Sequence, residues 1–283
     1  MKIKIVQLFA LLCLMVLLNN NLVAQNDMYV SLNVGYNFKL GTQAMLSENS
    51  NTNGGVSSVT SIRSIDLNVC KGSNIGGAIG YMFTKNIGAE LGFSYLMTGN
   101  TKANCDITTA YSVYKTPIQT DRSYSAGMLR IVPTLVIAGG FGKVDPYAKI
   151  GFLIGHTTMK LNYNFKEGGV ITSEQYKLNG GRALGAYTAV GVKYNIKGRI
   201  SVFLDVNMVN ISYAPTKCVL VERNVDGVDL LPTLTVKQKE IEFVNENNNN
   251  PSIQSTQSEP TRMSYVKMPF SSIGVNTGFV VSF

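Results

Sequence analysis

The carboxy-terminal stretch, residues 273–283, constrains the fold more than any other part of the sequence. Apolar side chains occupy every second position except 277, which is a threonine: Ile273, Val275, Phe279, Val281 and Phe283. The positions between them are small or polar, apart from Val280. Successive strand side chains point to opposite faces, so this segment has one apolar and one polar face. A flat apolar strand is an aggregation hazard in a soluble protein, whereas a transmembrane β-barrel places it against lipid.

The amino-terminal segment has the features of a secretory signal peptide. Lys2 and Lys4 precede an apolar run over 5–18, and the small residue Ala24 precedes Gln25. The run is roughly 14 residues long, shorter than the ~20 residues that a spanning helix needs. We therefore expect residues 1–24 to be a signal peptide and residues 25–283 to form the barrel domain.

Composition agrees with a barrel and argues against a nucleic-acid partner. Charged residues make up 15% of the chain, against a typical ~25%, and glycine accounts for 27 of 283 residues. The formal net charge of +8 is scattered, with no run of lysine and arginine of the kind that binds nucleic acid. One interpretation of this excess is that basic residues lie against anionic membrane lipid.

The same alternation recurs along the chain and predicts an all-β, eight-stranded, antiparallel, up-and-down transmembrane barrel. The expected strands are 28–38, 74–83, 87–97, 123–138, 146–164, 182–195, 199–213 and 273–283. Short turns follow the second, fourth and sixth strands, and long segments (39–73, 98–122, 166–181 and 214–269) follow the others. Strict alternation of short and long connections predicts periplasmic turns and external loops, with both termini periplasmic.

Two local features refine this expectation. Pro133 lies inside the fourth strand, and because proline has no N–H to donate we expect a β-bulge there. In the last long segment, residues 218–222 and 233–243 alternate around Asp226 and Gly227. We interpret them as a continuation of the seventh strand beyond the membrane, folding back as a hairpin.

Side-chain parity places a set of charged residues inside the barrel. Eight strands leave a lumen just wide enough for side chains to fill, and charges there must be paired. One interpretation is a structural network that fills the lumen, and the other is a gate whose pairs exchange partners to pass ions. The set is Glu90, Arg130, Lys149, Lys193 and Asp205.

We expect no catalytic residue, no cofactor and no metal site. The cysteines beyond the signal peptide, Cys70, Cys105 and Cys218, form no CxxC motif or Cys/His cluster, and the sequence does not choose a disulfide pair. His156 and Thr158 share the lipid-facing side of the fifth strand, which leaves a lipid-modifying enzyme as a distant alternative. Aromatic residues near strand ends predict interfacial girdles: Tyr36, Phe38, Tyr81, Phe83, Tyr95, Tyr194, Phe279 and Phe283.

Three segments carry a family resemblance. Residues 278–283, with Phe279, Val281 and Phe283, resemble the carboxy-terminal signal read by the outer-membrane assembly machinery. Residues 146–151 look like the fifth strand of OmpA-type barrels, and residues 203–215 are similar to the penultimate strand of Bacteroidetes outer-membrane β-barrel proteins. The resemblance to OmpA and OmpX implies integral outer-membrane location, with lipid, lipopolysaccharide and the assembly machinery as partners.

The expected function is structural, or surface interaction with an unidentified extracellular ligand through the loops. The alternative is a small pore for ions or solutes. An accessory barrel of a secretion system is a more distant possibility, alongside the lipid-modifying enzyme.

Overall fold

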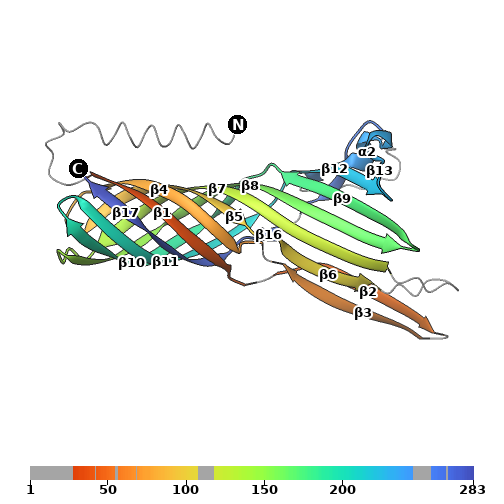
Figure 1. Cartoon of the computed structure of the whole chain (residues 1–283), viewed down its shortest axis with the longest axis horizontal. Helices are drawn as coiled ribbons and strands as arrows, with labels where there is room; N and C mark the ends of the chain where they lie inside the picture. The colour runs from red at the N-terminus through yellow and green to blue at the C-terminus, as the bar shows by residue number, and fades with distance from the viewer. Residues whose placement is uncertain are drawn as a thin grey trace.

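The computed structural model describes residues 28–41, 43–54, 57–67, 69–107, 118–244, 256–265 and 267–283. The predicted signal peptide and the asparagine-rich stretch 245–250 lie outside these residues. Eight antiparallel strands close into the barrel seen in Figure 1. They are β1 (Met28–Lys39), β4 (Gly72–Met82), β5 (Ile87–Thr98), β7 (Ile118–Ala138), β8 (Val144–Glu167), β10 (Ala183–Lys197), β11 (Ile200–Tyr213) and β17 (Ser272–Ser282).

The ring closes by continuous antiparallel pairing. Each barrel strand pairs with the next, and β17 pairs with β1 from Tyr29↔Ser282 to Lys39↔Ser272. A closed ladder leaves no edge strand, so the peptide groups of the wall bond within the sheet, as a lipid environment requires. The predicted fold is confirmed. Within the described residues, no helix is both long and apolar enough to cross a membrane.

The predicted faces of the strands are also confirmed. On β11 every odd-numbered residue from Ser201 to Tyr213 is buried, while the even-numbered ones are exposed or half-buried. On β1 the side chains of Leu32, Val34 and Phe38 are exposed on the outside, whereas Ser31 and Asn37 are buried inside. The exposed apolar side chains therefore form a belt on the outer wall, which is the surface expected to touch hydrocarbon.

The expected bulge at Pro133 is wrong. The register between β5 and β7 passes through Leu91↔Pro133 without a shift. Between β7 and β8 the pairing stops after Ile131↔Ile154 and resumes at Thr134↔Gly151 in the same register. The missing N–H of proline is therefore accommodated by a short gap in one ladder, without an inserted residue.

The long connections contain strands of their own. The first holds the hairpin β2 (Gln43–Gly54) and β3 (Ser57–Leu67), and the second holds β6 (Thr101–Ile107), which pairs with β7. The third is largely β9 (Val170–Asn179), which forms a hairpin with β8. We predicted these segments only as loops, since they lack the sustained apolar alternation of the barrel strands.

The hairpin expected in the last long segment is only partly right. β11 ends at Tyr213, and β12 (Lys217–Val225) pairs with β9 on one side and with β14 (Glu240–Val244) on the other. The turn at Asp226 and Gly227, both with positive φ, leads into the short strand β13 (Val228–Asp229). A 3₁₀ turn, η1 (Leu231–Thr233), and a single helical turn, α2 (Val236–Lys239), connect β13 to β14.

β8 carries the sheet beyond the barrel. It is 24 residues long, more than twice the ~9–11 residues that a membrane-spanning strand needs. Its distal half pairs with β7 and β9, and the sheet continues through β12 and β14 to β15 (Thr261–Ser264) (Figure 1). We call β9, β12, β14, β15 and the distal halves of β7 and β8 the extension sheet. It lies at the end of the barrel opposite the short turns and the carboxy terminus.

Buried apolar side chains gather where the barrel meets the extension sheet. Val69, Cys70 and Phe270 come from segments that lead into β4 and β17, and each is 0% exposed. They cluster with inward side chains of the barrel wall, including Leu96, Met128, Leu153, Val209 and Tyr213. We call this set the mouth cluster. The Tyr213 hydroxyl donates to the carbonyl of Gly180 at 2.8 Å, and its ring meets the Phe270 ring edge-on at 5.9 Å. The cluster closes this end of the lumen with apolar side chains.

The lipid-facing belt predicts a position-dependent effect of charge. Val190, 63% exposed near the middle of β10, should tolerate arginine poorly, because an arginine at the bilayer midplane costs about 2–4 kcal/mol. Val228→Arg, equally exposed but in β13 beyond the barrel, is the matched control and should change stability by less than about 0.5 kcal/mol. Denaturant unfolding in lipid vesicles, followed by far-UV circular dichroism, measures both. Equal effects of the two variants would contradict the assignment of the belt.

Candidate functional site

The side chains of the predicted lumen charges all lie inside the barrel. The least exposed salt bridge among them joins Lys149 to Glu90. Lys149 Nζ contacts both carboxylate oxygens of Glu90, at 2.7 and 2.8 Å. The two side chains are 12% and 7% exposed. The hydroxyl of Tyr29 donates to Glu90 Oε2 at 2.8 Å, so the carboxylate is held from two strands besides its own. Sequence reasoning selected both charges but not Tyr29, whose inward parity on β1 was the available signal.

A second polar group lies around Asp205. Its carboxylate accepts hydrogen bonds from the Tyr147 hydroxyl at 3.0 Å and from Asn276 Nδ2 at 3.0 Å. Asn276 in turn accepts from Asn74 Nδ2 at 3.2 Å. These bonds join β8, β11, β17 and β4 across the lumen. The partners of Asp205 are therefore neutral, and the prediction of charge pairing does not extend to this carboxylate.

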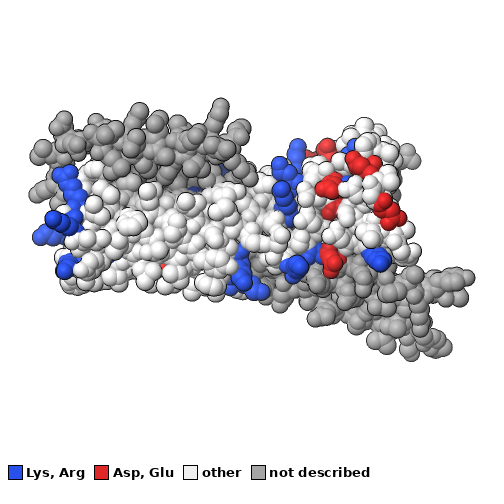
Figure 2. Space-filling view, viewed as in Figure 1, with Lys and Arg blue, Asp and Glu red and all other residues white. Residues whose placement is uncertain are grey.

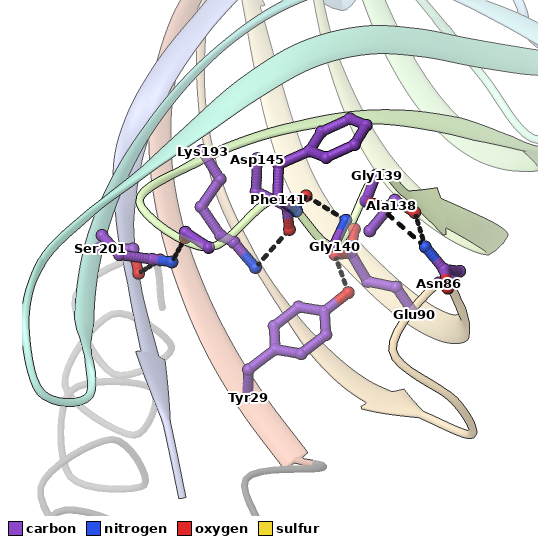
Figure 3. A network of polar contacts seen from close by, with 12 residues as sticks. Tyr29, Asn86, Glu90, Ala138, Gly139, Gly140, Phe141, Asp145, Lys193 and Ser201 are labelled. Atoms are coloured by element: carbon purple, nitrogen blue, oxygen red, sulfur yellow. Dashed lines mark hydrogen bonds and ion pairs between the residues drawn. The ribbon is translucent and has the colours of Figure 1, made fainter.

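The third group closes the short-turn end. Lys193 lies 3.3 Å from Asp145 Oδ2, a residue that we had placed in a turn and not in the network. Asp145 also accepts a 2.6 Å hydrogen bond from the backbone N–H of Gly140, in the turn between β7 and β8. Figure 3 shows this ion pair beside Tyr29 and Glu90, with Asn86 bonding the carbonyls of Ala138 and Gly139. The turn between β7 and β8 is thus bonded to the barrel wall through Asp145 and Lys193, and to the neighbouring turn through Asn86.

Arg130 stands apart from the other four predicted charges. It is 4% exposed, and its Nη2 donates to the Sγ atom of Cys70 at 3.6 Å. The Cys70 thiol donates to the carbonyl of Phe270 at 2.8 Å. Arg130 therefore ties the barrel wall to the mouth cluster. This contact was not predictable from the sequence, since Cys70 lies in a segment with no strand periodicity.

The lumen holds only small spaces. One cavity of about 60 Å³ is lined by residues that include Arg130, Asp205 and Asn207, and one of about 90 Å³ lies toward the short turns beside Tyr29 and Lys193. A water molecule needs at least about 10–15 Å³ measured in this way, so each cavity accommodates a few waters. The expectation of a lumen filled by side chains agrees with this arrangement.

The remaining candidates have simple surroundings. His156 is exposed on the outer face of β8, and Thr158 is half-buried on the same side. Cys70 and Cys218 are buried thiols, and burial raises the pKa of the Cys218 thiol in β12 to about 11. The side chain of Cys105 is outside the described part of the structure. Among the described residues no three metal-binding side chains come together.

The carboxy-terminal residues lie on the outer wall beside the first strand. Phe279 is 61% exposed on the apolar belt, while Val281 and Phe283 are half-buried. The backbone N–H of Phe283 donates to the carbonyl of Met28 at 2.8 Å, so the last residue completes the seam between β17 and β1. Whether these side chains act as an assembly signal stays a prediction.

The charged side chains of the outer surface lie at the two ends of the barrel. Figure 2 shows a barrel wall with almost no charge, bounded at each end by lysine and arginine, and acidic side chains farther out on the extension sheet. Exposed basic residues at the short-turn end are Lys85, Lys143, Lys197 and Arg199, and those at the other end include Lys39, Lys160, Lys177, Arg182 and Lys217. Basic residues at both edges of an apolar belt are well placed to meet anionic lipid headgroups.

The closed ring, its apolar belt and its polar interior define a transmembrane β-barrel. The family model of the outer membrane protein beta-barrel domain matches residues 9–230, and the chain belongs to this family. It is therefore an integral protein of the outer membrane.

Two solved structures show a more distant likeness. The crystal structure of CarO from Acinetobacter baumannii is 10% identical, with a TM-score of 0.30, covering 91% of this chain and 98% of that chain. The corresponding values for CarO2 of the same organism are 12%, 0.32, 90% and 99%. Similarity at this level carries no argument about activity. No curated protein matches the chain.

The Glu90–Lys149 pair should dominate lumen stability. Glu90→Gln leaves the buried ammonium of Lys149 without a carboxylate, and breaking a buried pair in this way costs about 3–5 kcal/mol. The double variant Glu90→Gln/Lys149→Met should recover most of this loss, because no unpaired charge remains. Denaturant unfolding followed by circular dichroism provides the double-mutant cycle.

Asp145→Asn is the control for this cycle. It leaves Lys193 without a carboxylate, but the Lys193 side chain is 32% exposed and water can solvate it, so loss of this pair should cost no more than about 1 kcal/mol. A loss as large as that of Glu90→Gln would mean that solvent exposure does not govern these pairs.

Proposed function

We propose that this protein is a non-enzymatic, closed outer-membrane barrel that presents the extension sheet at the cell surface for binding. The observation that carries the proposal is the contrast between the two parts of β8. Its first half lines a lumen filled by side chains, and its second half joins a broad sheet beyond the membrane. The filled half is suited to anchoring, and the broad half supplies the area that recognition needs.

The sheet has the chemistry of an interaction surface. One face carries a row of polar side chains across neighbouring strands, in which Gln175 Nε2 donates to Asn162 Oδ1 at 2.8 Å and Asn162 Nδ2 donates to Ser123 at 3.3 Å. The other face carries aromatic and charged groups, including Arg122, whose guanidinium lies 4.8 Å from the centre of the Tyr163 ring. Amide, aromatic and arginine side chains are common in binding sites, and these are held on a rigid sheet.

The orientation and the lipid contacts are part of the same proposal. Both termini face the periplasm, and the basic edge of the belt beside the extension sheet contacts phosphate groups of lipopolysaccharide. Phe279, Val281 and Phe283 act as the signal for the assembly machinery. We group the protein with OmpA- and OmpX-type barrels of the Bacteroidetes, for which the short turns and strand number are the supporting features.

The second candidate function is a small pore. The charges and amides that line the lumen favour it, because charged and polar groups also line ion-conducting pores. The mouth cluster argues against it, since Val69, Cys70 and Phe270 fill the end of the lumen with fully buried apolar side chains.

Planar-bilayer recording separates the two functions. We expect purified, folded protein to produce no stable single-channel steps, because ions have no polar path through the mouth cluster. Heat-modifiable migration on a gel verifies that the sample is folded. Reproducible conductance steps, changed in size by Glu90→Gln, would establish the pore instead.

Labelling of intact cells tests the orientation. Lys166 and Lys197 are both exposed, and each lies next to a tight glycine-containing turn. Lys166 is at the tip of the β8–β9 hairpin of the extension sheet, and Lys197 is in the short turn between β10 and β11 at the other end of the protein. In a cysteine-free background, Lys166→Cys should react with a membrane-impermeant maleimide on whole cells. Lys197→Cys should react only after the outer membrane is permeabilised. The reverse pattern would show that the orientation is the opposite one and that the extension sheet faces the periplasm.

A further inference from the structure

Arg130 is a buried cation that makes no salt bridge with any described carboxylate. The ion pairs among the described residues join Lys149 to Glu90, Lys193 to Asp145, Arg223 to Glu174 and Arg262 to Glu242, and none includes Arg130. Its Nη2 contacts the thiol of Cys70, and its Nε has no hydrogen-bond partner. A guanidinium that is 4% exposed is strongly disfavoured unless an anion or several acceptors lie beside it.

Two buried amides on the strands that flank β17 also have polar atoms without hydrogen-bond partners, and one of them, Asn207, lines the same cavity as Arg130. Asn37 on β1 and Asn207 on β11 both pair in register with Gly274 on β17, one from each side. They are 0% and 2% exposed. Neither polar atom of the Asn37 side chain has a hydrogen-bond partner, and neither does Asn207 Nδ2. Buried amides are normally hydrogen-bonded, so two adjacent exceptions indicate a missing partner.

Gly274 provides the space between the two amides. A Cβ atom at this position would overlap Asn37 Oδ1 and lie 2.9 Å from Asn207 Nδ2. Any larger residue would therefore displace both amides. Asn207 also lines the cavity of about 60 Å³ that Arg130 lines, so donors from two different walls of the lumen border one space.

The carboxylates of this cavity limit where an anion can lie. Asp205 and Glu90 line it too. Glu90 is paired with Lys149, and Asp205 is held in place by the neutral donors Tyr147 and Asn276. An anion is repelled from that side and attracted to the side formed by Arg130 and Asn207.

We propose that the lumen binds one small inorganic anion, of the size and charge of chloride, between Arg130 and Asn207. The anion accepts hydrogen bonds from Arg130 Nε and Asn207 Nδ2. It compensates the charge of Arg130, the only lumen cation among the described residues that makes no salt bridge. A cavity of about 60 Å³ admits one such ion with one or two waters. The mouth cluster, which includes Cys70 beside Arg130, shields the ion from bulk solvent.

The dependence of thermal stability on chloride tests the site. Folded protein in detergent is heated in sodium chloride and in sodium gluconate at equal ionic strength, and the midpoint is read from the loss of heat-modifiable migration. Chloride should raise the midpoint by about 5–10 °C at a hundredfold excess over its dissociation constant. Equal midpoints in the two salts would overturn the proposal.

Two matched variants separate a specific site from a general salt effect. Asn207→Asp places a carboxylate of the same shape beside Arg130, so the chloride-dependent shift should disappear. Asn210→Asp makes the same change on the exposed face of the same strand and should keep the full shift. If Asn207→Asp keeps a shift equal to that of the wild-type protein, the ion does not bind at Arg130 and the proposal is wrong.

Anomalous diffraction gives an answer that does not depend on any variant folding. Crystals of the wild-type protein grown in sodium bromide should show an anomalous peak between Arg130 Nε and Asn207 Nδ2. Density without anomalous signal at that place would identify ordered water as the missing partner and would overturn the proposal.

Discussion

Lipid offers no hydrogen-bond partner to a peptide group, and the architecture of this chain follows from that constraint. An open sheet would leave a row of N–H and C=O groups on each of its two edge strands facing hydrocarbon, at several kcal/mol for each group. The seam between β1 and β17 removes both rows, and the bond from Phe283 to Met28 extends the pairing to residue 283. Even Pro133 fits the rule, because its missing donor leaves only a short gap between β7 and β8.

Closing the barrel places polar side chains in a narrow interior, where each of them needs a partner. Strands with one face on lipid turn their other face into a narrow interior, where polar side chains meet each other instead of water. Glu90 with Lys149, and Asp205 with Tyr147 and Asn276, show two solutions, one by charge pairing and one by neutral donors. Arg130 shows a third, in which the guanidinium donates to a thiol and borders a small cavity instead of pairing with a carboxylate.

The barrel was predictable from the sequence because its signal is repeated and physical. A period of two over ten residues fixes which side chains face out, and a slip by one residue would reverse every face. Inward parity was therefore enough to select Glu90, Arg130, Lys149, Lys193 and Asp205. Their partners were harder to predict, because pairing depends on which strands are neighbours and how far they are staggered. Asp145 was missed as part of a turn, and Cys70 belongs to a segment without periodicity.

The extension sheet was not predictable by the same reasoning. Beyond the membrane no solvent difference separates the two faces of a strand, so polar residues occur on both and the period of two disappears. In β9 the pattern of buried and exposed residues is irregular, and β12 shifts register near Val221. The alternating fragments at 218–222 and 233–243 were the only indication. The first lies within β12, but the second includes the helical turn α2 before β14, and neither identified the partner strand β9.

The length of β8 imposes a restriction on how this protein can vary. At ~3.4 Å per residue its 24 residues span about 80 Å, and one uninterrupted backbone carries Lys149 in the lumen and Tyr163 in the outer sheet. Removing one residue between them would rotate everything on the far side by half a turn, exchanging the aromatic face for the amide face. Surface variation in descendants of this chain is therefore expected to accumulate in the hairpin tips, as whole-loop insertions or paired changes, while the shaft of β8 keeps its length.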